Sequence, residues 1–187
     1  MYPDGFVTEL RTLSKKKQFL FGLCNAERLL HFYVEFEEEW EVNQPYAILF
    51  AALELGYQYV VESSLITMRE LEQAMVQVEI AIPDNDEYDG STEVAYAQNA
   101  VLALYCSLKY AVQDRTASLL EACGKTIDTI DSIELDRVED ESFDTRPIID
   151  KEIALQLDYL EYLDKISLSE QNILSIRQLN QQNIIVA

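Results

Sequence analysis

Residues 14–40, SKKKQFLFGLCNAERLLHFYVEFEEEW, give the clearest indication of the fold of this chain. Apolar residues recur through the stretch at spacings of one to four, the pattern of a helix with a wide buried face. They are Phe19, Leu20, Leu23, Ala26, Leu30, Val34 and Phe36. Ser14 stands in the position of an N-cap. The stretch predicts one long helix from Lys15 to about Trp40.

Outside this stretch, helix boundaries are signalled at intervals along the whole chain. A short opening helix carries Phe6, Leu10 and Leu13. Later helix starts are indicated by Pro45, a capping box at residues 67–70, Ser91 or Thr92, Asp114, Pro147 and Ser169. Only residues 184–186 have any strand character. We therefore expect an all-α fold, a single-domain bundle of seven or eight helices over residues 1–187.

The charge of the chain is −20 and is unevenly distributed. Residues 34–93 hold 15 acids and one base, Arg69, and residues 128–164 hold 13 acids and three bases. An apolar content of 49% indicates a folded protein rather than a disordered acidic tail. Such a negative surface repels nucleic acids and anionic membranes and favours encounters with a basic protein.

Three cysteines, Cys24, Cys106 and Cys123, are odd in number and far apart, which favours reduced thiols in a cytoplasmic protein. The N-terminus lacks the pattern of a secretory signal. No stretch of about 18 residues is apolar enough to be read as a membrane span.

Several segments together resemble a known family. They are FLFGLCNAERLL at residues 19–30, IPDNDEYD at 82–89, the alanine-rich segment that follows, the helices predicted over 127–133 and 152–163, and NII at 183–185. In this order they resemble the YjaG-like family, domain-of-unknown-function family 416, whose members are bacterial, all-helical and functionally uncharacterised. His31 stands where the family commonly has proline, so the resemblance is to a divergent member. It implies no active site.

The candidates for chemistry are few. Cys24, Glu27 and His31 share one face of a helix, but Cys24 and His31 lie about 10 Å apart along its axis, too far for proton transfer. We expect a structural thiol, with His31 near the surface and paired with Glu27. One histidine does not suffice for the usual di-iron carboxylate site. No catalytic residue, metal site or cofactor is predicted.

The loop at residues 83–91 is acidic but lacks the pattern of a calcium loop. Counted from Asp84, the fifth, sixth and twelfth positions of an EF-hand fall on Tyr88, Asp89 and Ala95 instead of an oxygen ligand, glycine and glutamate. Weak binding of a divalent cation by the loop at residues 84–89, with Asp84, Asp86 and Asp89, stays open.

Acidic residues with neighbouring aromatics are instead typical of a surface that grips a basic partner. The residues predicted to bind such a partner are Glu37, Glu38, Glu41, Asp84, Asp86, Glu87, Tyr88, Asp89, Glu139, Asp140, Glu141, Phe143 and Asp144.

Three hypotheses from different classes follow. The first is an immunity or inhibitor protein that neutralises a basic toxin, such as a nuclease, by direct binding. The second is a non-enzymatic accessory or signalling-associated protein of the YjaG-like kind, with a homodimer open as its assembly. The third is a carboxylate and metal enzyme with ligands among Glu37, Glu38, Asp84 and Asp86. The absence of a recognisable catalytic set favours the first.

Overall fold

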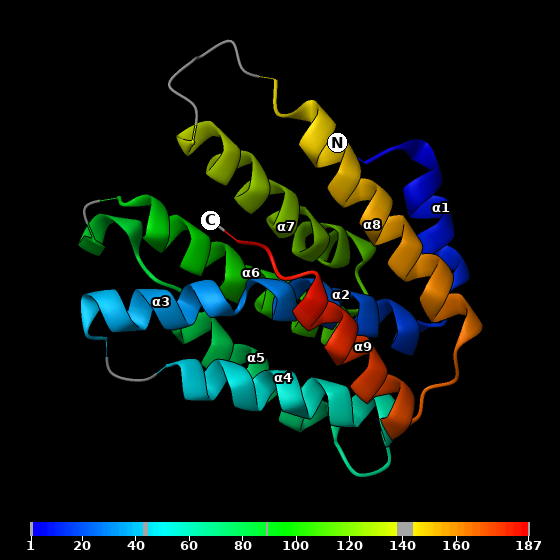
Figure 1. The fold of residues 1–187 in the computed structure, drawn as a ribbon. Helices are drawn as coiled ribbons and strands as arrows, with labels where there is room; N and C mark the ends of the chain where they lie inside the picture. The colour runs from blue at the N-terminus through cyan, green and yellow to red at the C-terminus, as the bar shows by residue number, and fades with distance from the viewer. Residues whose placement is uncertain (1, 43–44, 89, 138–143, 187) are drawn as a thin grey trace.

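Helix α2 (Lys15–Leu29) runs through the centre of the protein, and every residue from 18 to 29 is buried. The computed structural model describes residues 2–42, 45–88, 90–137 and 144–186 (Figure 1). Around α2 lie α6 (Thr92–Gln113), α7 (Thr116–Asp136), α4 (Tyr46–Val61), α8 (Arg146–Lys165) and α9 (Glu170–Gln182). A helix buried on all sides needs apolar residues around its whole circumference, and α2 has them.

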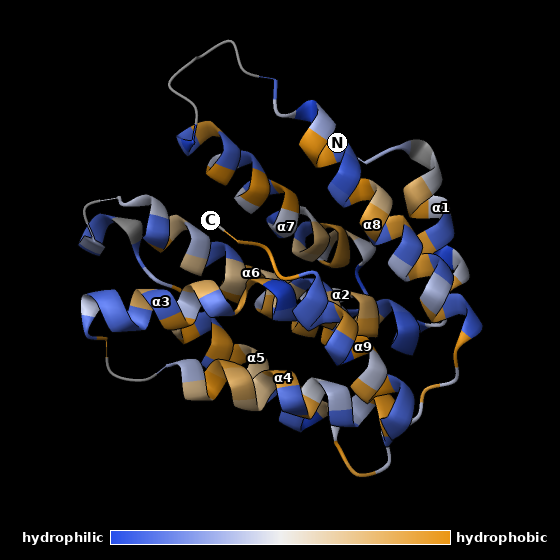
Figure 2. Ribbon diagram, in the orientation of Figure 1, coloured by the Kyte–Doolittle hydropathy of each residue, from blue (hydrophilic) through white to orange (hydrophobic). Residues whose placement is uncertain are grey.

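The remaining helices extend this arrangement. Helix α3 (His31–Trp40) continues from α2 and packs on α6, α5 (Met68–Ile80) packs on α4 and α6, and α1 (Asp4–Thr12) lies against α8. A short 3₁₀ helix, η1 (Asn85–Tyr88), precedes α6. Apolar and hydrophilic residues alternate along most helices (Figure 2), and apolar side chains such as those of Leu53, Leu71 and Leu104 are buried in the core. The prediction of an all-α bundle is confirmed.

The helix predicted over residues 15–40 is divided at Leu30. Leu30 keeps a helical backbone, with φ −61° and ψ −20°, but the N–H of Tyr33 donates to the Leu30 carbonyl in a tightened turn. The carbonyl of Arg28 accepts the N–H of Ile185 instead, at 3.5 Å. The C-terminal tail, which forms no strand among the described residues, thus contacts the chain at this turn.

Side-chain hydrogen bonds confirm three of the predicted helix starts. Thr67 and Glu70 form the capping box, and Ser91 and Ser169 accept N–H groups of α6 and α9. The prediction for Asp114 was wrong. This residue ends α6 in the left-handed conformation, with φ 55°, and its carboxylate pairs with Lys15. No helix in the described part of the chain has the length and hydropathy of a membrane-spanning segment.

Gly22 allows α2 to approach α6 and α7 closely. A Cβ at this position would lie 2.6 Å from Oγ of Ser107 and 2.8 Å from Cδ1 of Leu119. Both contacts are shorter than real Cβ contacts, so α2 or its neighbours would have to shift.

We expect Gly22→Ala to lower the free energy of unfolding by about 1–3 kcal/mol, the usual cost of overpacking a core. Gly124→Ala on α7 is the matched control, because nothing lies within 4 Å of its added Cβ. The control should be neutral or stabilise the protein by up to about 1 kcal/mol through helix propensity. Urea unfolding followed by circular dichroism measures both, and equal effects would contradict the close approach.

Candidate functional site

The end of α3 exposes several of the predicted partner-binding carboxylates. Glu38 and Glu41 are exposed, while Glu37 is half-buried. Oε1 of Glu37 accepts the backbone N–H of Tyr46 at 2.5 Å and so satisfies an N–H in the first turn of α4. Glu37 therefore has a structural role that the sequence pattern did not reveal.

The segment around η1 supplies the second acidic group. Asp84, Asp86 and Glu87 are exposed, and the N–H of Asp86 donates to Oδ1 of Asp84 at 3.0 Å. This local hydrogen bond is typical of a turn started by aspartate. Asp89, also predicted, lies outside the described residues.

Tyr88 joins these two groups into one surface. Its half-buried ring packs edge-on against Phe36 and Trp40, with ring centroids 5.0 and 5.3 Å apart. The contacts hold η1 beside the far end of α3, whose hydrophilic colouring is visible in Figure 2. We call the resulting surface the acidic end. It is formed by Glu38, Glu41, Asp84, Asp86 and Glu87.

Asp144 lies elsewhere, at the start of α8, with α6 and α7 between it and α3 (Figure 1). It is exposed and binds the Arg146 guanidinium, with distances of 2.7 and 2.8 Å. The hydrogen bonds from Arg146 lower the pKa of Asp144. The predicted residues Glu139, Asp140, Glu141 and Phe143 lie outside the described residues.

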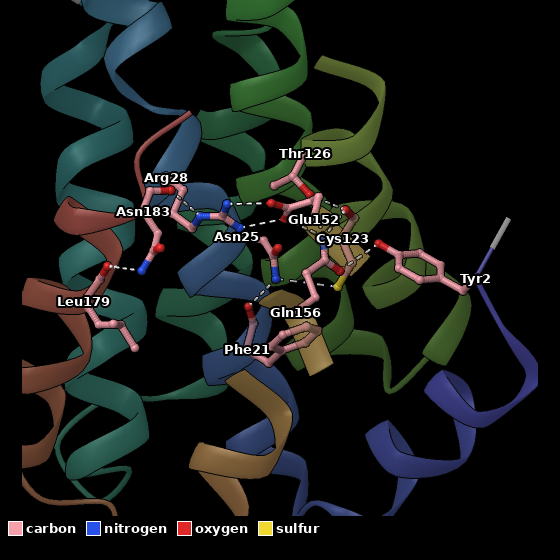
Figure 3. Close-up of polar contacts among 10 residues, drawn as sticks. All are labelled: Tyr2, Phe21, Asn25, Arg28, Cys123, Thr126, Glu152, Gln156, Leu179 and Asn183. Carbon is pink, nitrogen blue, oxygen red and sulfur yellow. Dashed lines mark hydrogen bonds and ion pairs between the residues drawn. The ribbon is translucent and has the colours of Figure 1, made fainter. Parts of the chain in front are cut away.

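A buried ion pair links the centre of the bundle to α8 (Figure 3). The Arg28 guanidinium donates to both carboxylate oxygens of Glu152 at 2.7 Å, and the two side chains are only 3% and 4% exposed. Gln156 donates to Glu152 at 2.9 Å and to Thr126 at 2.7 Å, and accepts from Tyr2 at 2.9 Å. The pair is well satisfied, which suits a structural role.

A second buried carboxylate, that of Glu27, lies one residue before Arg28 in the sequence and on another side of α2. Glu27 accepts from Tyr57 at 2.7 Å, Asn180 at 2.6 Å and Arg177 at 2.7 Å. The predicted pairing of Glu27 with His31 was therefore wrong, because α4 and α9 supply its partners. The sequence did contain a signal for these two buried ionic contacts: Glu27 and Arg28 are adjacent, oppositely charged residues within a largely apolar helix.

The cysteines and His31 offer no reactive arrangement. Cys24, Cys106 and Cys123 are buried and free. Burial raises the pKa of all three thiols, that of Cys106 to about 12, so the nucleophilic thiolate is disfavoured at neutral pH. Neither nitrogen of the His31 ring makes a hydrogen bond. Across the described ranges, no three His, Cys, Asp or Glu side chains are grouped to hold a metal ion.

Comparison with known proteins supports the resemblance seen in the sequence. A family model described as "Protein of unknown function (DUF416)" matches residues 5–185. The crystal structure of a DUF416 family protein from Shewanella baltica OS155 is similar, with 20% sequence identity and a TM-score of 0.80. The match covers 97% of this chain and 95% of that chain. No functionally curated protein matches this chain.

Breaking the buried Arg28–Glu152 pair should be strongly destabilising. We expect Arg28→Met or Glu152→Leu alone to cost about 3–5 kcal/mol, because each leaves a buried charge without its partner. The double variant should lose much less than the sum. Urea unfolding measures the cycle, with Lys165→Met, which breaks the exposed pair with Glu161, as a control of little effect. Additive losses would contradict the coupling.

His31 should make stability depend on pH. Burial lowers its pKa, although the nearby carbonyls of Arg28 and Ile185 oppose the shift without forming well-oriented hydrogen bonds. The unfolded chain therefore binds the proton more readily, and stability is lost as the pH falls below the usual histidine pKa of about 6.5.

We expect His31→Gln to remove this component. Unfolding free energies measured between about pH 7.5 and 5.5 should show the wild type losing stability relative to the variant on acidification. If the difference in unfolding free energy between wild type and variant stays constant over this range, the folded protein accepts the proton on His31 as readily as the unfolded chain does.

Proposed function

This chain belongs to the DUF416 family of unknown function, and we propose that it is a non-enzymatic binding protein whose acidic end captures a basic partner protein. The family supplies no activity to transfer. The proposal therefore depends on the surface itself.

The proposal is based on a group of carboxylates that have no ionic partner and lie on segments held together by aromatic packing. Glu38, Glu41, Asp84, Asp86 and Glu87 are exposed, and none forms an ion pair with a base in the described part of the chain. The packing of Tyr88 on Phe36 and Trp40 fixes their supporting segments. A fixed surface of one charge sign steers an oppositely charged protein and loses little conformational entropy on binding.

The charges at this end do not serve the stability of the helix that carries them. The last turn of α3 contains no basic residue, and its C-terminus bears the negative end of the helix dipole. Carboxylates there repel each other and the dipole. A binding role accounts for charges that the fold itself disfavours.

In its most specific form, the proposal is an immunity or inhibitor protein. The partner would be a basic toxin, a nuclease or similar effector, that this protein neutralises in the cytoplasm of the bacterium that makes it. Opposite charge on the two partners would make capture fast, which suits an inhibitor that must act before its toxin does.

The test reverses the charges of the acidic end. Affinity capture from the native bacterium first supplies the partner, and surface plasmon resonance then measures association across a salt series. We expect Glu38→Lys, Asp84→Lys, Asp86→Lys and Glu87→Lys together to slow association by about tenfold or more, because steering contributes about 10–10³ to such rates. Added salt should slow the wild type and have little effect on the variant.

The matched control reverses four exposed acids elsewhere: Glu9, Glu72, Asp158 and Asp164. It changes the net charge equally, so a specific role of the acidic end requires a smaller effect from the control. Inhibition of the captured partner's toxicity tests the immunity role directly. The proposal would be overturned if the association rate of the partner changed neither with salt nor with either set of charge reversals.

A further inference from the structure

A groove lies between α4 and α9 on a different part of the surface. Both helices pack more closely on α2 than on each other, and side chains such as Arg177 and Glu54 bridge the space between them. The groove between them has a volume of about 540 Å³ and includes residues of the segment between α4 and α5. This volume is in the range of small-molecule sites, about 300–1,000 Å³.

Each helix contributes one face to the groove. Residues 54, 57, 58 and 61 of α4 and residues 170, 173, 174 and 177 of α9 follow the spacing of a single helix face. The apolar part of the lining is formed by Val61, Leu65, Ile66, Ile173 and Leu174. Leu65 is 68% exposed and Leu174 56% exposed, so apolar surface is open to solvent here.

Arg177 is the one basic residue among those that line the groove, and its guanidinium already has partners. Nε of Arg177 lies 2.7 Å from Oε1 of Glu27, and its Nη2 lies 2.6 Å from Oε1 of Glu54. The guanidinium also lies over the Tyr57 ring, 4.8 Å from its centroid. An anionic ligand would have to displace these carboxylates, so the groove disfavours anions.

The carboxylates of the groove are less well satisfied. Glu62 and Glu170 are exposed and make no side-chain hydrogen bond or ion pair with any described residue. Oε1 of Glu54 is buried and, despite its short distance to Arg177, lacks a well-oriented hydrogen bond. The groove is lined by three carboxylates, those of Glu54, Glu62 and Glu170, and by one guanidinium. The lining therefore has a net negative charge beside its apolar residues.

We propose that this groove binds a small amphipathic cation, an ammonium group attached to an aliphatic or aromatic chain. The ammonium group pairs with the carboxylates of Glu62 and Glu170, and the chain contacts Val61, Ile66 and Leu174. The match of charge and apolar surface to the lining is the basis of this assignment. The site is independent of the acidic end.

Isothermal titration calorimetry with four probes tests the ligand class. Hexylamine should bind saturably, whereas hexanol lacks the charge, hexanoate has the wrong charge and methylamine lacks the apolar chain. We expect hexanol and hexanoate to bind at least about tenfold more weakly because neither can donate a charge-assisted hydrogen bond to the carboxylates. Methylamine should also bind at least about tenfold more weakly, because it buries no apolar chain. Equal binding of hexanol or hexanoate would overturn the proposal.

Variants locate the site. Glu62→Gln with Glu170→Gln should weaken hexylamine binding by about tenfold or more, and Leu174→Ser should weaken it while leaving the fold intact, because that side chain is largely exposed. Glu9→Gln with Glu72→Gln is the control of equal charge and should bind as the wild type does. The acidic-end reversal should also leave binding unchanged, which separates this proposal from the proposed function.

The assignment would also be overturned if hexylamine showed no saturable binding, whether or not a basic amphipathic peptide binds instead, or if the control variant lost binding equally. Circular dichroism confirms that each variant is folded before its binding is compared.

Discussion

The burial of Glu27 and Arg28 in the central helix is the constraint on which much of the structure depends. Neighbouring positions on a helix point in different directions, so these two charges require partners on different sides of α2. Arg28 finds Glu152 on α8, and Glu27 finds Tyr57 on α4 and Arg177 on α9. A buried charge without a partner costs several kcal/mol, so these pairs fix where α8, α9 and α4 lie around α2. Arg28 also positions the C-terminal tail, because its Nε donates a hydrogen bond to the carbonyl of Asn183.

The same constraint explains why a groove exists beside α2. Helix α9 is drawn to α2 by Arg177 and Asn180, and α4 is joined to the same carboxylate by Tyr57. Both helices therefore face α2, and their backbones lie closer to α2 than to each other. The Glu27–Arg177–Glu54 cluster spans the gap, and the lining that remains is apolar with unpaired carboxylates at Glu62 and Glu170. A stabilising cluster in the core and a candidate ligand site thus share the side chain of Arg177.

The acidic end depends on a different kind of contact, the packing of aromatic rings. Tyr88 lies against Phe36 and Trp40, and Tyr33 donates a hydrogen bond to the carbonyl of Ala81 at 3.0 Å. These contacts hold two acidic segments together although their charges repel each other, because the apolar contacts are short-ranged and strong while exposed charges are screened by solvent. Tyr88 therefore positions the candidate surface, and direct contact of its half-buried ring with the partner stays a prediction.

Helix positions and the all-α class were determined by the sequence itself, because caps, prolines and apolar spacing act within a few residues. The capping box at Thr67, the caps at Ser91 and Ser169 and the acidic character of residues 84–87 were all predicted this way. The turn at Leu30, the partners of Glu27, the capping of α4 by Glu37 and the joining of α3 to η1 were decided only by the tertiary structure. Each of these depends on a group more than one helical turn away in sequence, such as Ile185, Arg177, Tyr46 or Tyr88. Local patterns specify which residues are charged or buried, but the partner that satisfies a buried charge is chosen by how the helices pack.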